Sequence, residues 1–209
     1  MPERLRAAPM RWVAAIVASL ACVALASLGD VWTYHHVSLP RVYDTDWGRA
    51  LRTMGYWPLW AIVAFAIWRH GEGSGQQPDR RARSRWQAAW LVGAVTVAGI
   101  AAELLKLLIR RERPGADSGL YVFRAWTDRP FSTSGFGMPS SHAVEAFAAA
   151  TVLAGCFPET AVVWYGLAIG CAVTRLLSGA HFLSDVVAGA ALGLLVAHAL
   201  RRAFRPGAS

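Results

Sequence analysis

Three polar side chains lie between two long apolar runs in the C-terminal half of the chain. They are Arg175, His181 and Asp185, and the last two are four residues apart. If a helix starts near His181, these two side chains share one face, and the carboxylate can accept a hydrogen bond from one imidazole nitrogen. The other nitrogen is then free to act as a nucleophile or a base. The pattern indicates a reactive histidine.

Two further polar clusters occur earlier in the chain, at Lys106 with Arg113-Pro114 and at Pro139-Ser140-Ser141-His142. Lys106, Arg113 and Arg175 are three cations, and the two arginines present planar forks that match the oxygens of a phosphate. Ser140, the backbone N–H of Ser141 and the start of a helix can donate further hydrogen bonds to an anion. These residues predict a phosphate-binding site beside the two histidines.

The composition indicates that this site lies at a membrane. Of the 209 residues, 55% are hydrophobic and only 16% are charged, whereas about a quarter of a typical soluble domain is charged. A net charge of +8 could indicate nucleic-acid binding, but the arginines are dispersed between apolar segments, so no nucleic-acid partner is expected. We interpret the arginines as topology signals and phosphate ligands.

Apolar segments predict an all-α fold, a polytopic membrane bundle of six transmembrane helices that forms one membrane-embedded domain over residues 1–209. The predicted spans are 12–28, 53–68, 86–109, 140–156, 161–177 and 182–200. The Arg-rich connection 69–85 is expected to be cytoplasmic by the positive-inside rule, which makes both termini cytoplasmic and the polar stretch 30–55 an external loop. This arrangement brings all three polar clusters to one side of the membrane.

The first apolar run has a second interpretation. Basic residues precede it, and Ala24-Leu25-Ala26 imitates the cleavage site of a secretory signal. The run is longer than the usual apolar core of about 7 to 15 residues in a signal peptide. We therefore expect a retained helix.

The three clusters together resemble the three-part signature of the type 2 phosphatidic acid phosphatase family, which includes membrane lipid phosphatases and related haloperoxidases. The signature covers residues 106–185, and the six-helix pattern extends the resemblance to most of the chain. Any one cluster would be a weak signal, but their order and spacing agree as a set. Two positions depart from the family pattern, Ser141 in place of the usual Gly and Thr174 in place of the usual Ser. Ser141 keeps its backbone N–H, and Thr174 keeps a hydroxyl.

The resemblance implies roles for the two histidines. His181, oriented by Asp185, would attack phosphorus, while His142 would protonate the leaving oxygen and then activate water against the phosphohistidine. From the residues alone, the two histidines could exchange these roles.

The implied activity is a lipid phosphate phosphatase in a bacterial cytoplasmic (inner) membrane, acting at its periplasmic or outer face. Its substrate would be a lipid phosphate or diphosphate, such as undecaprenyl diphosphate, phosphatidylglycerol phosphate, phosphatidic acid or lipid A phosphate. Two alternatives stay open: a phosphotransferase of the same family that uses a lipid diphosphate, and a non-catalytic anion-binding or transport protein. An external loop is expected to distinguish headgroups through Tyr121, Phe123, Arg124, Trp126, Asp128 and Arg129.

Glu103 and Glu145 have two interpretations. Glu103 precedes Lys106 by three residues, and Glu145 follows His142 by three. Each carboxylate could tune its neighbour or line the substrate groove, or it could make a polar contact between helices.

No metal and no cofactor are expected, because side-chain cations fill the role that Mg²⁺ has in other phosphoryl-transfer sites. The sequence also has no carboxylate cluster spaced to hold such an ion. We predict that EDTA leaves the rate of phosphate release unchanged. Loss of activity in EDTA that Mg²⁺ restores would contradict this prediction.

Overall fold

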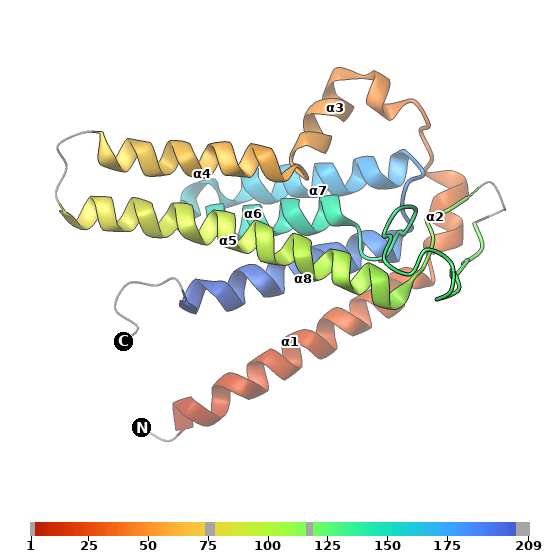
Figure 1. The fold of residues 1–209 in the computed structure, drawn as a ribbon, viewed down its shortest axis with the longest axis horizontal. Coiled ribbons are helices and arrows are strands. Elements are labelled where there is room, and N and C mark those ends of the chain that lie inside the picture. Colours follow the sequence, from red (N-terminus) through yellow and green to blue (C-terminus); the bar gives the residue numbers. More distant parts are fainter. Residues whose placement is uncertain (1–2, 74–77, 116–118, 204–209) are drawn as a thin grey trace.

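The computed structural model describes residues 3–73, 78–115 and 119–203. Over these residues the chain is helical, and its long loop carries two isolated β-bridges (Figure 1). The elements are α1 (Glu3–Ser27), α2 (Asp30–His36), the 3-10 helix η1 (Val42–Asp44), α3 (Asp46–Thr53), α4 (Trp57–Glu72), α5 (Pro78–Ile109), α6 (Ser141–Cys156), the 3-10 helix η2 (Pro158–Thr160), α7 (Ala161–Leu177) and α8 (Leu183–Ala203).

Helix α6 lies at the centre of the bundle, where α5, α7 and α8 pack around it. Its buried positions are mostly alanine, namely Ala143, Ala146, Ala148, Ala149 and Ala150. Small residues let neighbouring helix backbones approach closely. On α8 the approach requires glycine, since a Cβ at Gly193 would lie 2.4 Å from the carbonyl oxygen of Val144. This contact holds the first turn of α6 against the middle of α8.

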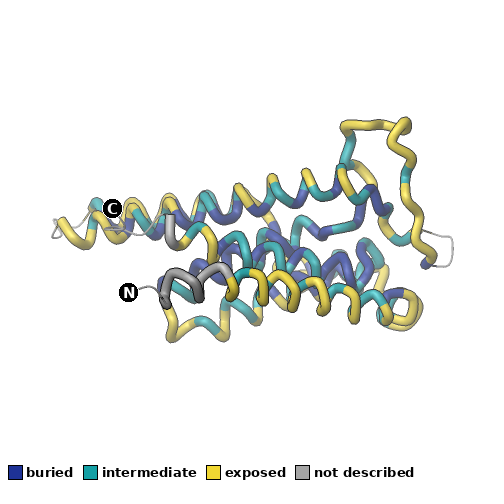
Figure 2. Tube along the Cα trace, turned by 90° about the horizontal axis from the view of Figure 1, so that it is seen from below, coloured by how far each residue is buried: buried dark blue, intermediate teal, exposed yellow. Residues whose placement is uncertain are grey.

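Helix α1 packs on α8 and exposes most of its surface (Figure 2). Its exposed side chains include Leu20 and Leu25, which are 64% and 69% exposed, and Leu28, just after its last residue, is 82% exposed. Exposing such a row of leucines to water is unfavourable, whereas the hydrocarbon of a lipid bilayer accommodates it. The exposed face of α1 is therefore a lipid-facing surface of an integral membrane protein.

The helix lengths confirm an all-α membrane bundle. Four segments are long and apolar enough to cross a bilayer, and α3 with α4, bent by 65°, would count as a fifth. Predicted span 161–177 matches α7, and predicted span 182–200 begins one residue before α8. The predicted span 140–156 corresponds to α6, which is apolar but, with 16 residues, too short to be counted among those four segments.

Two predicted loops are wrong in part. The polar stretch 30–55 forms α2, η1 and α3, and the Arg-rich connection 69–85 extends α4 and α5 up to residues 74–77, which lie outside the described residues. Thr45 caps α3 by accepting from the backbone N–H of Gly48 at 3.2 Å. Arg85 joins the extended helices through an ion pair with Glu72 at 2.6 Å. Composition alone did not reveal these local caps and pairs.

The architecture separates two ends of the bundle. The short helices α2 and α3 and the loop between α5 and α6 lie at one end, while α1 begins and α8 ends at the other (Figure 1). The first end also contains the starts of α6 and α8 and the ends of α5 and α7. This geometry brings the three polar clusters of the sequence together.

Candidate active site

His181 lies two residues before α8 and is buried. Its Nδ1 lies 3.0 Å from the carbonyl oxygen of Gly137 and 3.5 Å from Oδ2 of Asp185. Because both neighbours are acceptors, the proton belongs on Nδ1, and Nε2 keeps its lone pair. The predicted pairing with Asp185 is present, but the Gly137 carbonyl is the closer partner. Nε2 is the nitrogen available for chemistry.

Asp185 links the starts of two helices. Its Oδ2 accepts from the backbone N–H of Phe182 at 2.9 Å, and its backbone carbonyl accepts from Ser140 N–H at 3.0 Å. The side chain is fully buried. The carboxylate beside His181 is therefore held by the backbone of its own helix start, and that start is tied to the beginning of α6.

Gly137 has no room for a side chain, because a Cβ there would lie 2.7 Å from Oδ2 of Asp185. We predict that Gly137→Ala displaces the carboxylate and lowers the rate of phosphate release by about 100-fold, as misplacement of a catalytic group by about 1 Å can do. Gly115→Ala in the same loop is the matched control, since no atom of the described residues lies within 4 Å of its Cβ position. Equal rates for the two variants would contradict this account of Gly137.

His142 occupies the first turn of α6, close to the bend between α3 and α4. A Cβ at Gly55 would lie 2.6 Å from the Cα of His142, so glycine permits this approach. The ring of Tyr56 lies edge-on to the imidazole, with centroids 6.2 Å apart. Nε2 of His142 is buried and has no hydrogen-bond partner among the described residues.

Two more predicted site residues share this property. Oγ of Ser140 and Nε of Arg175 are buried without a hydrogen-bond partner in the described part of the chain, as is Nε2 of His142. Buried polar atoms normally find a partner in the protein, water or a ligand. A phosphate with oxygens on several sides would provide partners for all three atoms.

The three predicted cations have different surroundings. Arg175 is buried at the end of α7, where its Nη1 donates to the Tyr43 hydroxyl at 2.7 Å. Arg113 is exposed, and its backbone N–H donates to Gly135. Lys106 is buried and forms an ion pair with Glu103 at 2.7 Å, as well as a close contact with the Ser141 hydroxyl.

Glu103 makes contacts of both predicted kinds, with its neighbour Lys106 on α5 and with Ser141 on α6. One Oε1 atom accepts from both Lys106 and the Ser141 hydroxyl, the latter at 2.8 Å. The carboxylate therefore orients two predicted phosphate ligands. Oε2 of Glu145 is buried and has no hydrogen-bond partner among the described residues, and both glutamates line one groove.

Burial lowers the pKa of His181 to about 4, opposed by the hydrogen bond that its imidazole donates to Asp185 and assisted by the charges of Arg175 and Arg113. A protonated imidazole cannot attack phosphorus, so with His181 as the predicted nucleophile the rate should fall as the pH drops through this pKa. We predict that the acid limb of kcat/KM lies below pH 6, under the pKa of about 6.5 of an ordinary histidine. A pH profile with native enzyme checks this, and an acid limb at or above 6.5 would contradict it.

Several residues of the site were not among the sequence predictions. Arg111 lies against Asp185 and Ser184, Asp30 binds the start of α8, and Tyr43 contacts Arg175. Arg52 of α3 lies over the Tyr43 ring, 4.8 Å from its centroid. The dense positive charge at residues 110–113 was the only signal in the sequence for Arg111. Asp30 and Tyr43 had none, because they lie in a stretch interpreted as a loop.

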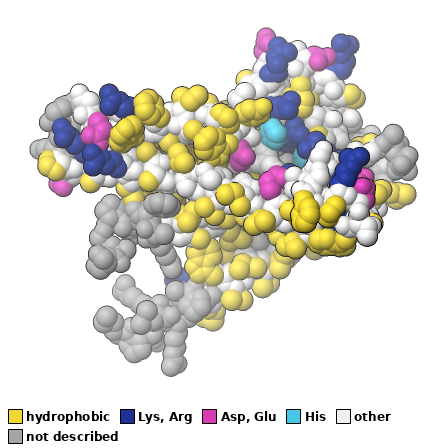
Figure 3. All heavy atoms as spheres, in the orientation of Figure 1, with side chains coloured by type: hydrophobic (Ala, Val, Ile, Leu, Met, Phe, Trp, Pro, Cys, Tyr) yellow, Lys and Arg dark blue, Asp and Glu magenta, His cyan; other side chains and the backbone are white. Residues whose placement is uncertain are grey.

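The site opens on the surface below α3. Figure 3 shows a histidine and basic side chains gathered there, with acidic side chains beside the apolar surface of α4 and α5. A groove of about 360 Å³ runs along this surface, lined by Trp57, Val95, Thr96, Gly99, Ile100, Glu103, Leu104, Leu107 and Glu145. Glu103 connects this groove to Lys106 and Ser141. The groove thus borders two of the predicted phosphate ligands, Lys106 and Ser141, through Glu103.

Comparisons of sequence and of fold relate this chain to known proteins. The family model of the PAP2 superfamily matches residues 87–206. A lipid A 1-phosphatase of Rhizobium etli is 29% identical over 194 residues, covering 88% of this chain and 82% of that protein. A lipid A 1-phosphatase of Rhizobium johnstonii is 38% identical over 110 residues, covering 52% of this chain and 44% of that protein.

A solved structure shares the fold. The transmembrane PAP2-type phosphatidylglycerolphosphate phosphatase of Bacillus subtilis superposes with a TM-score of 0.64, at 18% identity, over 91% of this chain and 94% of that chain. The resemblance that the three polar clusters carry is confirmed by the family match. The chain belongs to the PAP2 superfamily.

Proposed function

We propose that this PAP2 phosphatase removes the phosphate of a membrane lipid, with lipid A 1-phosphate as its first candidate substrate. Both curated relatives are lipid A 1-phosphatases. The proposal rests on three buried atoms, on Ser140, His142 and Arg175, that have no hydrogen-bond partner among the residues the structure describes. Their chemistry fits a phosphate group.

The proposed reaction has two steps. Nε2 of His181 attacks phosphorus, the bond from phosphorus to the lipid oxygen breaks, and His142 gives that oxygen a proton. His142 then takes a proton from water, which attacks the phosphohistidine and releases inorganic phosphate and His181. Arg175, Arg113 and Lys106 stabilise the charge on the transferring group.

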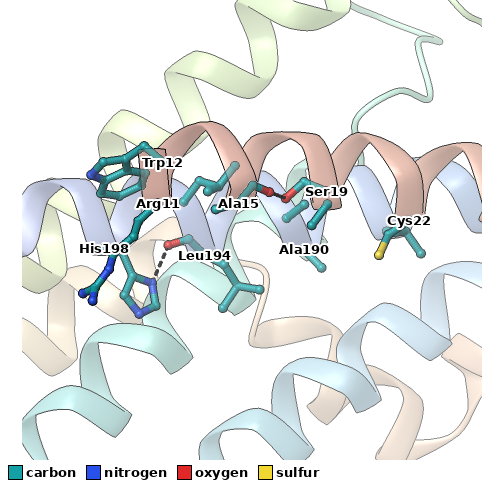
Figure 4. Close-up of a pocket in the computed structure, with 12 residues that line it drawn as sticks. Arg11, Trp12, Ala15, Ser19, Cys22, Ala190, Leu194 and His198 are labelled. Atoms are coloured by element: carbon teal, nitrogen blue, oxygen red, sulfur yellow. Dashed lines mark hydrogen bonds between the residues drawn. The ribbon is translucent and has the colours of Figure 1, made fainter. Parts of the chain in front are cut away.

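The lipid would reach the site from the membrane plane. The groove between α4, α5 and α6 would take its hydrocarbon, because its wall is mostly apolar apart from Thr96 and the two glutamates. The larger groove between α1 and α8, about 630 Å³, contains none of the predicted site residues. Figure 4 shows Arg11, Trp12 and His198 at one of its ends.

The proposed topology has six spans in one domain over residues 1–209, with α6 as the fourth and α3 with α4 as the second. Cytoplasmic termini are supported by the Arg-rich hairpin between α4 and α5, which lies at the same end as the start of α1 and the end of α8 (Figure 1). The site would then face the periplasm or exterior of a bacterial inner membrane.

A panel of purified lipid phosphates tests the proposal. Native enzyme in detergent is expected to release inorganic phosphate fastest from lipid A that carries a 1-phosphate, and more slowly from phosphatidic acid, phosphatidylglycerol phosphate and undecaprenyl diphosphate. With labelled substrate, the label should appear in inorganic phosphate, whereas label on a second lipid would indicate a phosphotransferase. Release from none of these lipids would refute the proposal.

A further inference from the structure

A buried arginine lies behind the carboxylate that contacts His181. The guanidinium of Arg111 is 5% exposed, its Nη2 donates to Asp185 Oδ1 at very close range, and it donates to the Ser184 hydroxyl at 2.7 Å. The rings of Tyr121 and Phe182 cover it, with centroids 4.8 and 5.3 Å from its Cζ. Asp185 is thus shared between Arg111 on one oxygen and His181 on the other.

A second carboxylate, from the N-terminal part of the chain, completes this cluster. Asp30 is the first residue of α2 and is fully buried. It accepts from the backbone N–H of Ser184 at 2.7 Å, from the Ser184 hydroxyl, and from the Tyr121 hydroxyl at 2.7 Å. Its Oδ2 lies 3.8 Å from Nη1 of Arg111. Asp30 therefore holds the first turn of α8 and the guanidinium together.

Charge balance gives the cluster a direct effect on His181. A buried ion stays charged only if an opposite charge or several hydrogen bonds compensate it. Arg111 compensates Asp185, and Asp30 compensates Arg111. The negative charge that Asp185 presents to His181 therefore depends on both of the other residues.

We infer that Asp30 and Arg111 are positioning residues for the nucleophile, which fix the Asp185 carboxylate and set how much of its charge faces His181. This inference rests on the proposed role of His181. The family match begins at residue 87, so Asp30 contributes to the site from outside the matched region.

The inference predicts opposite effects on the acid limb of the pH–rate profile. The groups that face His181 are Asp185 of α8, Arg175 of α7, His142 of α6 and the loop residue Arg113. Without the positive charge of Arg111, the Asp185 carboxylate stabilises the protonated imidazole more strongly, which raises the pKa of His181. Without the negative charge of Asp30, Arg111 neutralises Asp185 more fully, which lowers the pKa of His181. A merely structural role would lower the rate without these opposite movements.

The variants are Asp30→Asn, Arg111→Gln and Arg111→Lys. Asp30→Asn keeps the shape and one acceptor oxygen, and it is expected to lower kcat about 10-fold and move the acid limb to lower pH. Arg111→Gln should lower kcat about 100-fold and move the limb to higher pH, and Arg111→Lys should recover part of both effects. KM should stay unchanged, because neither residue contacts a predicted phosphate ligand. Asp46→Asn is the control, since that carboxylate is fully exposed at the same end of the bundle.

A titration of labelled histidine by NMR measures the pKa of His181 without turnover, with the signal assigned by its absence in His181→Ala. Opposite pKa movements in Asp30→Asn and Arg111→Gln support the inference even if the lipid substrate is misassigned. Native rates in both variants, or reduced rates with no pKa movement in either, overturn it. Absence of phosphate release by native enzyme would instead count against the proposed function.

Discussion

Replacing His181 with alanine is expected to lower phosphate release by at least about 10⁴-fold, because removal of a nucleophile leaves only binding and charge stabilisation. The measurement is phosphate release from lipid A at saturating substrate, with circular dichroism to verify the helical fold.

The control for this variant is His198→Ala. His198 is also on α8, but it is exposed, and its Nδ1 lies 2.8 Å from the backbone oxygen of Leu194 one turn earlier. This variant should keep the native rate. A folded His181→Ala protein that still releases phosphate at more than a hundredth of the native rate would show that His181 is not the nucleophile.

Replacing His142 with alanine is expected to slow hydrolysis of lipid phosphates by about 10²- to 10⁴-fold, the usual contribution of a general acid or base. An activated aryl phosphate should rescue the first step, because its leaving oxygen needs no proton. The second step should stay slow, since no base is left to activate water. The variant should therefore show a burst of aryl alcohol followed by a slow steady rate.

A matched control is His36→Ala, since His36 is exposed at the same end of the bundle, where its ring stacks on Trp32. It should hydrolyse both substrates at native rates. If His142→Ala is slowed equally for the lipid and for the aryl phosphate, with no burst, then His142 does not protonate the leaving group.

Much of the site follows from the sequence because its signals are local. Lys106, His142 and Arg175 interrupt apolar runs at positions that one helix length brings to the same membrane face. The bounds of α7 agree with the predicted span 161–177, since a Pro-containing turn precedes it and glycine follows its last residues. Local composition was sufficient wherever a polar residue stood alone between apolar neighbours.

The remaining contacts depend on tertiary structure. Asp30 and Ser184 are 154 residues apart, and Arg111 and Asp185 are 74 apart. Arg110 and Arg111 are adjacent and look alike in the sequence, yet Arg110 donates to loop carbonyls such as that of Asp128, while Arg111 faces the carboxylate beside His181. A break of helix at residue 110, which has a φ of 57°, separates their directions, and no periodic pattern in the sequence marks it.

The most direct test of the account is to trap the phosphoenzyme. The His142→Ala protein would be mixed with an aryl phosphate labelled in its phosphate group, quenched in alkali, digested and analysed by mass spectrometry. The account predicts about one phosphate per chain, stable in alkali and lost in acid, on the peptide that contains His181, and none in the His142→Ala/His181→Ala protein. Label on another residue, or equal labelling of both proteins, would contradict the assignment of His181 as the nucleophile.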